Sequence, residues 1–249
     1  MPGKTDTDSI PADTSRFATT HWSLVLAAGS SESTRHHEAL EVLCQTYWFP
    51  LYAYLRRRGH ESHEAEDYTQ GFFAKILERR GLRQADPTCG KFRSFLLASL
   101  KNFVADERGH AQAQKRGGGK KIVSLDLDTA EKRYAKEPTH RLSPEKLFER
   151  SWALAVLKRA MICLKNESKT GDKQQIFSHL KIYLTMEAHV VPYRETAAKL
   201  NMTEGAVKVS VLRLRRRYRE LVKDEIARTV SSEAQVDEEI RDLFAALSS

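Results

Sequence analysis

The sequence contains few cysteines and no long hydrophobic run, and each absence removes a class of protein. Its three cysteines, Cys44, Cys89 and Cys163, are widely spaced and include no C-x-x-C pair, so neither a disulfide framework nor a cysteine zinc site is indicated. No apolar run approaches the roughly 20 residues that span a bilayer. The N-terminus also lacks the apolar segment of a signal peptide. We therefore expect a cytoplasmic protein that does not insert into membranes.

Strand signals are scarce as well, because alternating β-branched runs are nearly absent and only Ile122 to Leu127 is a short candidate. The composition, 30% charged and 41% hydrophobic, is typical of a soluble, well-packed helical protein. We therefore predict an all-α fold. The net charge of +8, from 41 Lys plus Arg against 33 Asp plus Glu, favours a polyanionic partner.

Patterns for metal binding and catalysis are weak. The stretch His60 to Glu64 contains two histidines and two glutamates, but it misses the H-E-x-x-H spacing of zinc helices by one residue, and no third ligand is placed. The glycine-rich stretch Lys115 to Lys121 lacks the first glycine and the final Ser or Thr of a phosphate-binding P-loop. No serine has a placed activating partner. We therefore expect no metal, no cofactor and no enzymatic activity.

The stretch Tyr193 to Leu221 has the pattern of a helix-turn-helix. After Pro192, which suits a helix start, a first helix is predicted over 193–200. Asn201 tolerates the left-handed conformation that the turn requires. Thr203 is the expected N-cap of a second helix, with Glu204 in its first turn, where the helix dipole favours an acid.

In this second helix the apolar residues recur mostly at steps of three and four, which predicts one buried face. Those residues are Val207, Val211, Leu214, Tyr218, Leu221 and Val222. Lysine and arginine residues occupy the rest of the circumference, and the N-terminal end of such a helix enters the major groove of DNA. A solvated basic helix is the simpler alternative, but the turn, the cap and both helical patterns would then have to coincide by accident.

Further amphipathic patterns predict helices over about 36–58, 62–79, 91–114, 144–164, 173–187 and 236–247. Pro50 is expected to kink or break the first of these helices, and Gly59 to end it. The helix over 91–114 is basic with aromatic residues near its start, which suits either unpaired bases or core packing. Residues 122–144 are polar and are interpreted as an irregular linker. The last helix is acidic and could fold back on the basic chain or bind a partner.

Several short motifs occur in an order that resembles a known family. They are D-x-x-Q at Asp67 to Gln70, F-R-S-F-L at Phe92 to Leu96, K-N at Lys101 and Asn102 followed by Asp106, and T-E-G-A-V-K at Thr203 to Lys208 before R-x-R-R-R. Over about residues 17–247 the chain resembles the extracytoplasmic-function (ECF) group of the bacterial sigma-70 family. The stretches T-H-W-S-L-V (20–25) and Q-K-R-G-G-G (114–119), with the acidic tail, look closest to the variant typical of planctomycete-like bacteria.

This resemblance implies an RNA polymerase sigma factor, a subunit without chemistry of its own that directs the core enzyme to specific promoters and starts transcription. It implies a sigma-two-like helical domain over 17–114 and a sigma-four-like helix-turn-helix domain over 145–226, joined by a flexible linker over 115–144. A disordered lead over 1–16 and an acidic helical tail over 227–249 complete the expected organisation.

The resemblance also implies roles for individual residues. Core polymerase binding is expected at Asp67, Gln70 and Phe73. Recognition and melting of the minus-ten promoter element, partly through support of the fold, is expected at Phe92, Arg93, Lys101, Asn102 and Asp106. Reading of the minus-thirty-five element is expected at Thr203, Glu204, Lys208 and Arg213. Phosphate contacts are expected mainly at Arg215, Arg216, Arg217 and Arg219.

The expected partners are bacterial core RNA polymerase and promoter DNA, with an anti-sigma factor or a regulatory kinase as candidate regulators. The chain departs from the family pattern at three places: Gly71 stands where an acid is usual after Gln70, 166–172 lengthens a normally compact loop, and Asn201 replaces the usual Gly, which the turn tolerates. The alternative function is a stand-alone helix-turn-helix transcriptional regulator, which would bind duplex DNA without polymerase, as a dimer on paired half-sites.

Overall fold

The computed structural model describes residues 34–78, 91–113, 127–137, 142–169, 172–184, 191–230 and 232–248. Within these ranges the chain forms only helices and no strand, which confirms the all-helical prediction. The elements are α2 (Thr34–Arg57), α3 (Ser62–Glu78), α4 (Phe92–Ala113), α5 (Leu127–Tyr134), α6 (Pro144–Glu167), α7 (Asp172–Leu180), the 3-10 helix η3 (Lys181–Leu184), α8 (Tyr193–Leu200), α9 (Glu204–Ala227) and α10 (Glu233–Leu247).

Some predictions fall outside the described residues. These are the N-terminal lead, the T-H-W-S-L-V and Q-K-R-G-G-G stretches and most of the strand candidate over 122–127. Of the helices that are described, none is long and apolar enough to cross a membrane.

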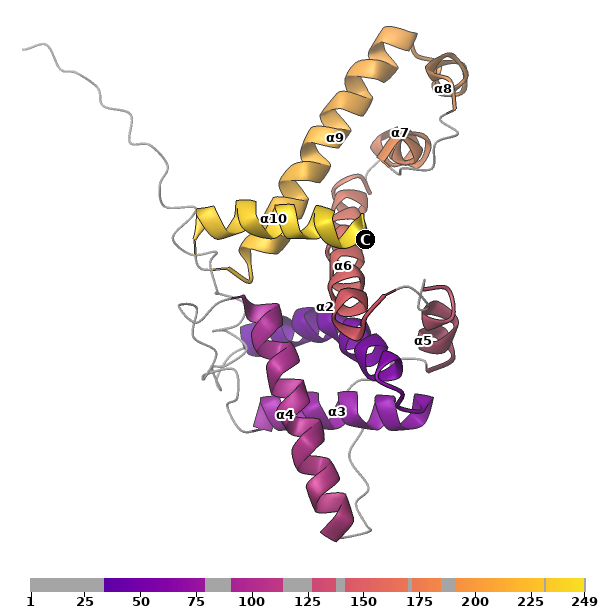
Figure 1. Ribbon diagram of the computed structural model, residues 1–249. Helices are drawn as coiled ribbons and strands as arrows, with labels where there is room; N and C mark the ends of the chain where they lie inside the picture. The colour runs from indigo at the N-terminus through magenta and orange to yellow at the C-terminus, as the bar shows by residue number, and fades with distance from the viewer. Residues whose placement is uncertain are drawn as a thin grey trace, which may run out of the picture.

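The helices form two groups that α6 connects (Figure 1). Helices α2, α3 and α4 lie together at one end, and α7, α8 and the first half of α9 lie at the other. The long helices α6 and α9 run between the two groups, and α10 crosses them near the middle of the molecule. Two stretches far apart in the sequence, α4 and α10, therefore come close to one another.

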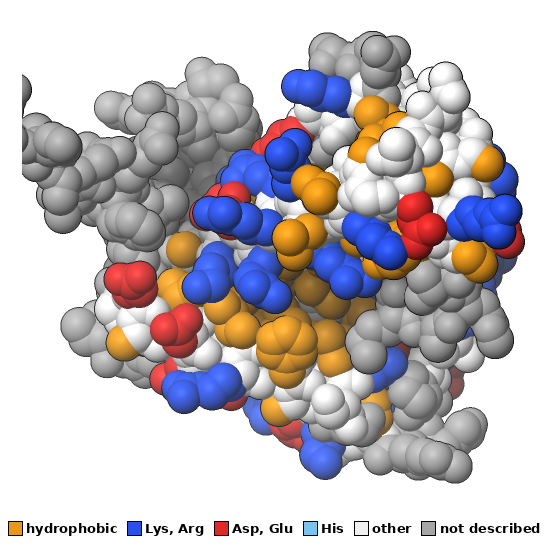
Figure 2. Space-filling model, turned by 90° about the horizontal axis from the view of Figure 1, so that it is seen from above, with side chains coloured by type: hydrophobic (Ala, Val, Ile, Leu, Met, Phe, Trp, Pro, Cys, Tyr) orange, Lys and Arg blue, Asp and Glu red, His pale blue; other side chains and the backbone are white. Residues whose placement is uncertain are grey.

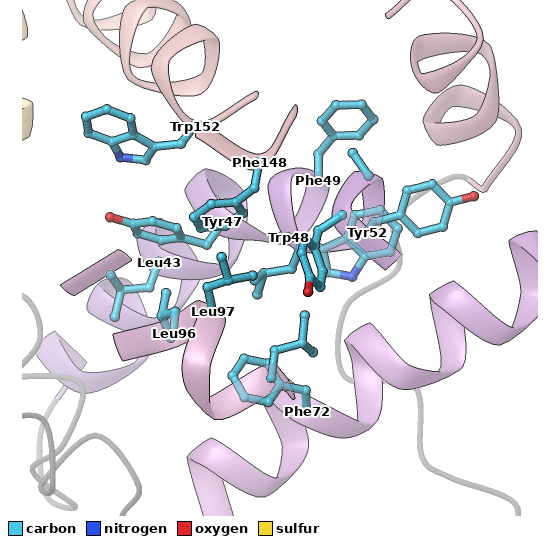
Figure 3. Close-up of a cluster of buried hydrophobic side chains, with 14 of the residues drawn as sticks. Leu43, Tyr47, Trp48, Phe49, Tyr52, Phe72, Leu96, Leu97, Phe148 and Trp152 are labelled. Carbon is cyan, nitrogen blue, oxygen red and sulfur yellow. The ribbon is translucent and has the colours of Figure 1, made fainter. Parts of the chain in front are cut away.

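The largest core cluster is built around α2, which is buried on all sides from Leu51 to Leu55. Trp48 stacks on Tyr52 with ring centroids 5.1 Å apart. Side chains from α3, α4 and α6 join α2 in this cluster (Figure 3). They include Phe72, Leu96, Leu97, Phe148 and Trp152. A helical segment that is apolar all round requires such partners on every side, which explains why this part of α2 is central.

Helix α2 is continuous through Pro50, so Pro50 does not break the helix, and the kink that was the alternative expectation stays a prediction. Proline removes one backbone donor, and the tight packing on every side of this segment stabilises the helix in spite of that loss. The predicted end at Gly59 is confirmed. Gly59 has φ +92°, and the N–H of His60 donates to the Leu55 carbonyl at 3.2 Å, which closes the helix with a left-handed residue.

The irregular course predicted for 122–144 is wrong at α5. The Glu131 carboxylate of α5 accepts hydrogen bonds from the Tyr52 hydroxyl and from Arg56 Nε, the latter at 2.8 Å. The Arg133 guanidinium lies 3.6 Å from the centre of the Phe49 ring. An isolated eight-residue helix is marginal in water, so these contacts with α2 account for its formation.

Two other helix ends differ from the predictions. Helix α6 continues to Glu167, so the loop predicted from 166 begins later. The helix predicted over 173–187 becomes a 3-10 turn at 181–184.

The main core cluster contains residues from both sides of 115–144, such as Leu43 and Leu147. The described packing therefore does not divide the chain into two domains, and that division stays a prediction.

Candidate nucleic-acid interface

Helices α8 and α9 form a helix-turn-helix whose turn follows from its sequence. Asn201 adopts the left-handed conformation, with φ 51° and ψ 45°, as predicted. The N–H of Met202 donates to the Ala197 carbonyl at 3.0 Å, which ends α8. Thr203 then caps α9, because its hydroxyl accepts from the Ala206 N–H at 3.2 Å. In this structure the Thr203 hydroxyl caps the start of α9.

Packing fixes the angle between the two helices. Val207 and Val211 of α9 are buried against Ala197 of α8 in a small cluster that also includes Leu180 and Tyr183. The Tyr183 hydroxyl donates to the Val191 carbonyl at 2.8 Å and lies 2.7 Å from the hydroxyl of Thr196. A buried phenol with two partners is held in one orientation. The predicted buried face of the second helix is confirmed, and on the opposite face of α9 the side chains at 208, 209, 212 and 213 are exposed.

The four residues expected to read the minus-thirty-five element all lie at the surface. Glu204 and Lys208 form an ion pair one turn apart at 2.8 Å, and Arg213 follows further along α9. Figure 2 views the molecule from the α7–α9 end and shows Lys and Arg side chains gathered there with hydrophobic side chains between them. The arrangement provides cations at a helix end, as groove binding requires.

The four arginines expected to contact phosphate differ in the contacts that their guanidinium groups make with other helices. Arg216 and Arg219 are exposed. Arg215 donates from Nε and Nη2 to the Tyr183 carbonyl at 3.2 and 3.1 Å. Arg217 donates to the Glu167 carboxylate at 2.6 Å, and this hydrogen bond, with a second that Arg217 donates to the Glu220 carboxylate, raises the pKa of its guanidinium. Arg215 and Arg217 therefore brace α9 against η3 and α6.

The residues expected to bind core polymerase do not share one surface. Asp67 is exposed on α3, and Gln70 is half-buried and donates to the Glu66 carboxylate at 2.8 Å. Phe73 lies in the main core cluster, 3% exposed. Its aromatic ring stabilises the fold of α3 and is not available to a partner. Gly71 packs closely on Phe103, since a Cβ at position 71 would lie 3.1 Å from that ring.

The residues expected to recognise the minus-ten element also include both exposed and buried side chains. Lys101, Asn102 and Asp106 are exposed on α4. Lys101 Nζ pairs with the Glu145 carboxylate at 3.0 Å, while Asp106 pairs with Lys75 on α3 at 3.4 Å. Phe92 and Arg93 are buried, 1% and 5% exposed, so in this structure neither side chain can meet DNA.

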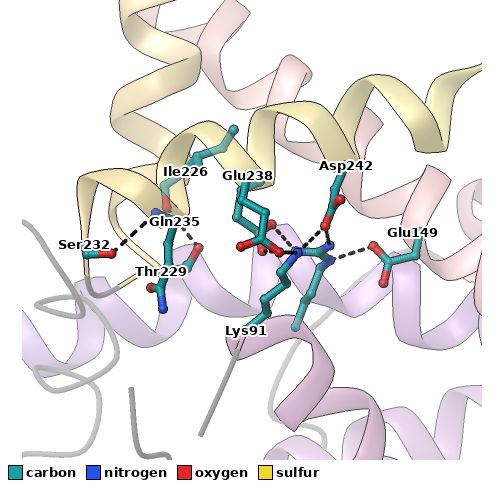
Figure 4. A network of polar contacts seen from close by, with 10 residues as sticks. Lys91, Glu149, Ile226, Thr229, Ser232, Gln235, Glu238 and Asp242 are labelled. Atoms are coloured by element: carbon teal, nitrogen blue, oxygen red, sulfur yellow. Dashed lines mark hydrogen bonds and ion pairs between the residues drawn. The ribbon is translucent and has the colours of Figure 1, made fainter. Parts of the chain in front are cut away.

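Arg93 is enclosed by carboxylates from two helices. Its guanidinium pairs with Glu149 of α6 at 2.6 Å, with Asp242 of α10 at 2.7 Å and with Glu239 of α10. It also lies 4.3 Å from the centre of the Trp152 ring. Figure 4 shows the side chains of α10 and α6 converging on the start of α4.

Lys91 joins the same network, which we call the α10 clamp: Lys91 and Arg93 on one side, and Glu149, Glu238, Glu239 and Asp242 on the other. Burial alone would lower the pKa of Arg93, but the bonds to Glu239 and Glu149 raise it. Burial likewise opposes ionisation of Asp242, yet Lys91 and Arg93 hold its pKa below the usual value. For Glu239 burial is stronger and raises the pKa.

Sequence reasoning missed the α10 clamp. The carboxylates at 238, 239 and 242 share one side of α10, a spacing that is readable in the sequence. Their partners lie about 150 residues earlier, and no local signal links the two stretches. The sequence allows the acidic tail either to fold back or to bind a partner, and in the structure α10 folds back on Lys91 and Arg93.

No group of three or more His, Cys, Asp or Glu side chains in the described ranges is placed to hold a metal. His60 instead lies 3.0 Å from the Glu64 carboxylate and 3.2 Å from Arg108. Cys44 is buried, and burial raises the pKa of its thiol to about 12.

Comparisons of the chain with protein-family models, with curated proteins and with solved structures found no match.

Proposed function

We propose that the chain is a sigma factor of the ECF type, which brings core RNA polymerase to specific promoters. The observation that carries the proposal is the helix-turn-helix, in which a capped α9 leaves Glu204, Lys208 and Arg213 exposed around the part of its surface that does not pack on the core. A face of this kind fits the major groove. The order of the motifs ahead of it connects this module to promoters and polymerase.

The proposal assigns α4 and α3 to the other steps of initiation. Exposed Lys101, Asn102 and Asp106 would meet the minus-ten element, while Phe92 supports the fold beneath them. On α3, Asp67 with Gln70 would contact polymerase. Residues 17–114 and 145–226 would then act as the two promoter-reading parts of one subunit.

Arg93 places a condition on this function. Because the α10 clamp encloses its guanidinium, Arg93 can reach DNA only after α10 moves away from α4. The double variant Glu238→Gln/Asp242→Asn removes two half-exposed carboxylates and leaves the buried Glu239 in place. If Arg93 contacts the minus-ten element, this variant gives more promoter opening than the wild type. Unchanged opening assigns Arg93 to the fold.

Transcription in vitro tests the proposed function. Bacterial core RNA polymerase is supplied with the full chain and with DNA from upstream of its own gene, at several salt concentrations. We expect a transcript from a defined start that depends on the chain and falls steeply as salt rises. No specific transcript and no co-purification with core polymerase would refute the sigma assignment. Specific duplex binding as a dimer without polymerase would instead support the stand-alone regulator.

Arg213→Ala sharpens the same test, with Arg213→Lys as the matched control that keeps the charge. A bidentate contact to one base pair predicts a loss of about 1–3 kcal/mol at a single promoter position for both variants. Equal weakening on every sequence by Arg213→Ala, rescued by lysine, would show a phosphate contact in place of base reading.

A further inference from the structure

The solvent-facing side of α9 carries two large apolar side chains at its centre. Val209 and Leu212 are 48% and 68% exposed, although they lie within the most basic helix of the chain. At about 100° per residue, the buried residues Val207 and Val211 mark one side of α9, and Val209 and Leu212 project from the opposite side. A large part of both side chains is therefore in contact with water.

The residues around the pair have a matching arrangement. On the helical wheel Lys208 lies at one margin of the exposed arc and Arg213 at the other, with the apolar pair between them. Cations at both margins suit the phosphates on the two edges of a groove. The centre of the arc would then face the edges of the base pairs, where each base offers hydrogen-bonding groups and thymine alone offers a methyl group.

Gly205 continues the same arc toward the start of α9. It has no positive φ, and a Cβ built there meets nothing within 4 Å. Neither backbone conformation nor packing against the described residues therefore requires glycine at position 205. Close approach of a ligand to the backbone of α9 is a remaining physical reason for a glycine at position 205.

We infer that Val209 and Leu212 are specificity-determining residues that contact thymine methyl groups in the major groove of the DNA that α9 reads. This inference rests on the proposed function and deepens it. The pair is separated by three residues, about 4.5 Å along the helix axis. Since base pairs rise about 3.4 Å, the two contacts fall on base pairs no more than about two steps apart.

The test uses uracil, which differs from thymine in DNA only by the absence of the methyl group. A duplex is first selected from a random library by the full chain with bacterial core RNA polymerase. Each thymine is then replaced singly by deoxyuridine, and affinity is measured by anisotropy at one fixed salt concentration. At one or two thymines we expect a loss of about fourfold, since burying one methyl-sized group contributes about that factor.

Leu212→Ala and Val209→Ala should each abolish the difference between thymine and uracil at one of these positions. Ile162→Ala is the matched control, because Ile162 is also exposed, at 47%, but lies on α6. It should keep the wild-type discrimination. All three changes are at the surface, and thermal unfolding followed by circular dichroism checks that each variant folds.

The outcomes separate the inference from the function on which it rests. Sequence-selective binding without any thymine-to-uracil effect overturns the inference and leaves the proposed function standing. The same holds if discrimination persists in both alanine variants. If the library yields no preferred sequence, the proposed function fails, and the inference fails with it.

Discussion

Replacing Arg93 by methionine is expected to destabilise the protein by about 4 kcal/mol, within the range for breaking a buried ion pair. The change removes the guanidinium and keeps most of the length of the side chain. Glu239, only 3% exposed, would then keep Lys91 Nζ at 3.7 Å as its remaining cation. Its Oε1 already makes no hydrogen bond.

The magnitude follows from which carboxylates can return to water. The Glu149 and Asp242 side chains are 33% and 38% exposed, so water can replace the lost arginine at both. Most of the cost therefore comes from Glu239, with a smaller part from the lost contact between Arg93 and Trp152. A second change, Glu239→Leu, removes the stranded charge, so the double variant should recover most of the lost stability.

Urea unfolding followed by far-ultraviolet circular dichroism measures the free energy of unfolding of both single variants and the double variant. Arg216→Met is the matched control, because the Arg216 side chain is 83% exposed and pairs with Glu220 on the surface. No measurable change is expected there. A cost below about 1 kcal/mol for Arg93→Met, or a double variant as unstable as the sum of the singles, would refute the buried network.

Three further outcomes are expected. Thr203→Ala should cost about 1 kcal/mol, measured by the same unfolding, because α9 loses its cap, and Thr203→Ser should restore it. Asn201→Val should cost about 1–2 kcal/mol, since a β-branched residue is strained at φ 51°, whereas Asn201→Gly should cost nothing; equal effects would contradict the left-handed turn. Acid should destabilise the fold, because the pKa values of the Glu145 and Asp242 carboxyls are lowered in the folded state, that of Glu145 by the hydrogen bond from Lys101. The stabilisation from these two carboxylates is complete above their ordinary pKa values of 4.5 and 3.8, and it is lost as the pH falls further. A Tm that does not fall with pH in that window would contradict this.

Elements with local signals were predicted well from the sequence. The helical spacing of apolar residues gave α2, α3, α4 and α6 within a few residues of their ends. Asn201 and Thr203 predicted the turn and the cap, because a left-handed residue and a capping hydroxyl act on backbone groups only a few positions away. The surface position of Lys208 and Arg213 followed from the same spacing.

Site residues with long-range partners were predicted less well. The resemblance places Phe92 and Phe73 at binding surfaces, but both lie in the core, because aromatic residues at helical spacing suit either place. Arg93 was assigned to DNA and is buried. Its environment depends on α6 and α10, whose positions no local pattern reveals.

The sequence by itself determined that the chain is helical and where a helix-turn-helix begins, turns and ends, since these depend on interactions between near neighbours. The tertiary structure decided which cations are available to a partner. It enclosed Arg93 among the carboxylates of α10, fixed Arg215 and Arg217 against neighbouring elements, and left Lys208 and Arg213 at the surface. Charge is readable from sequence, but its availability depends on residues that only folding brings together.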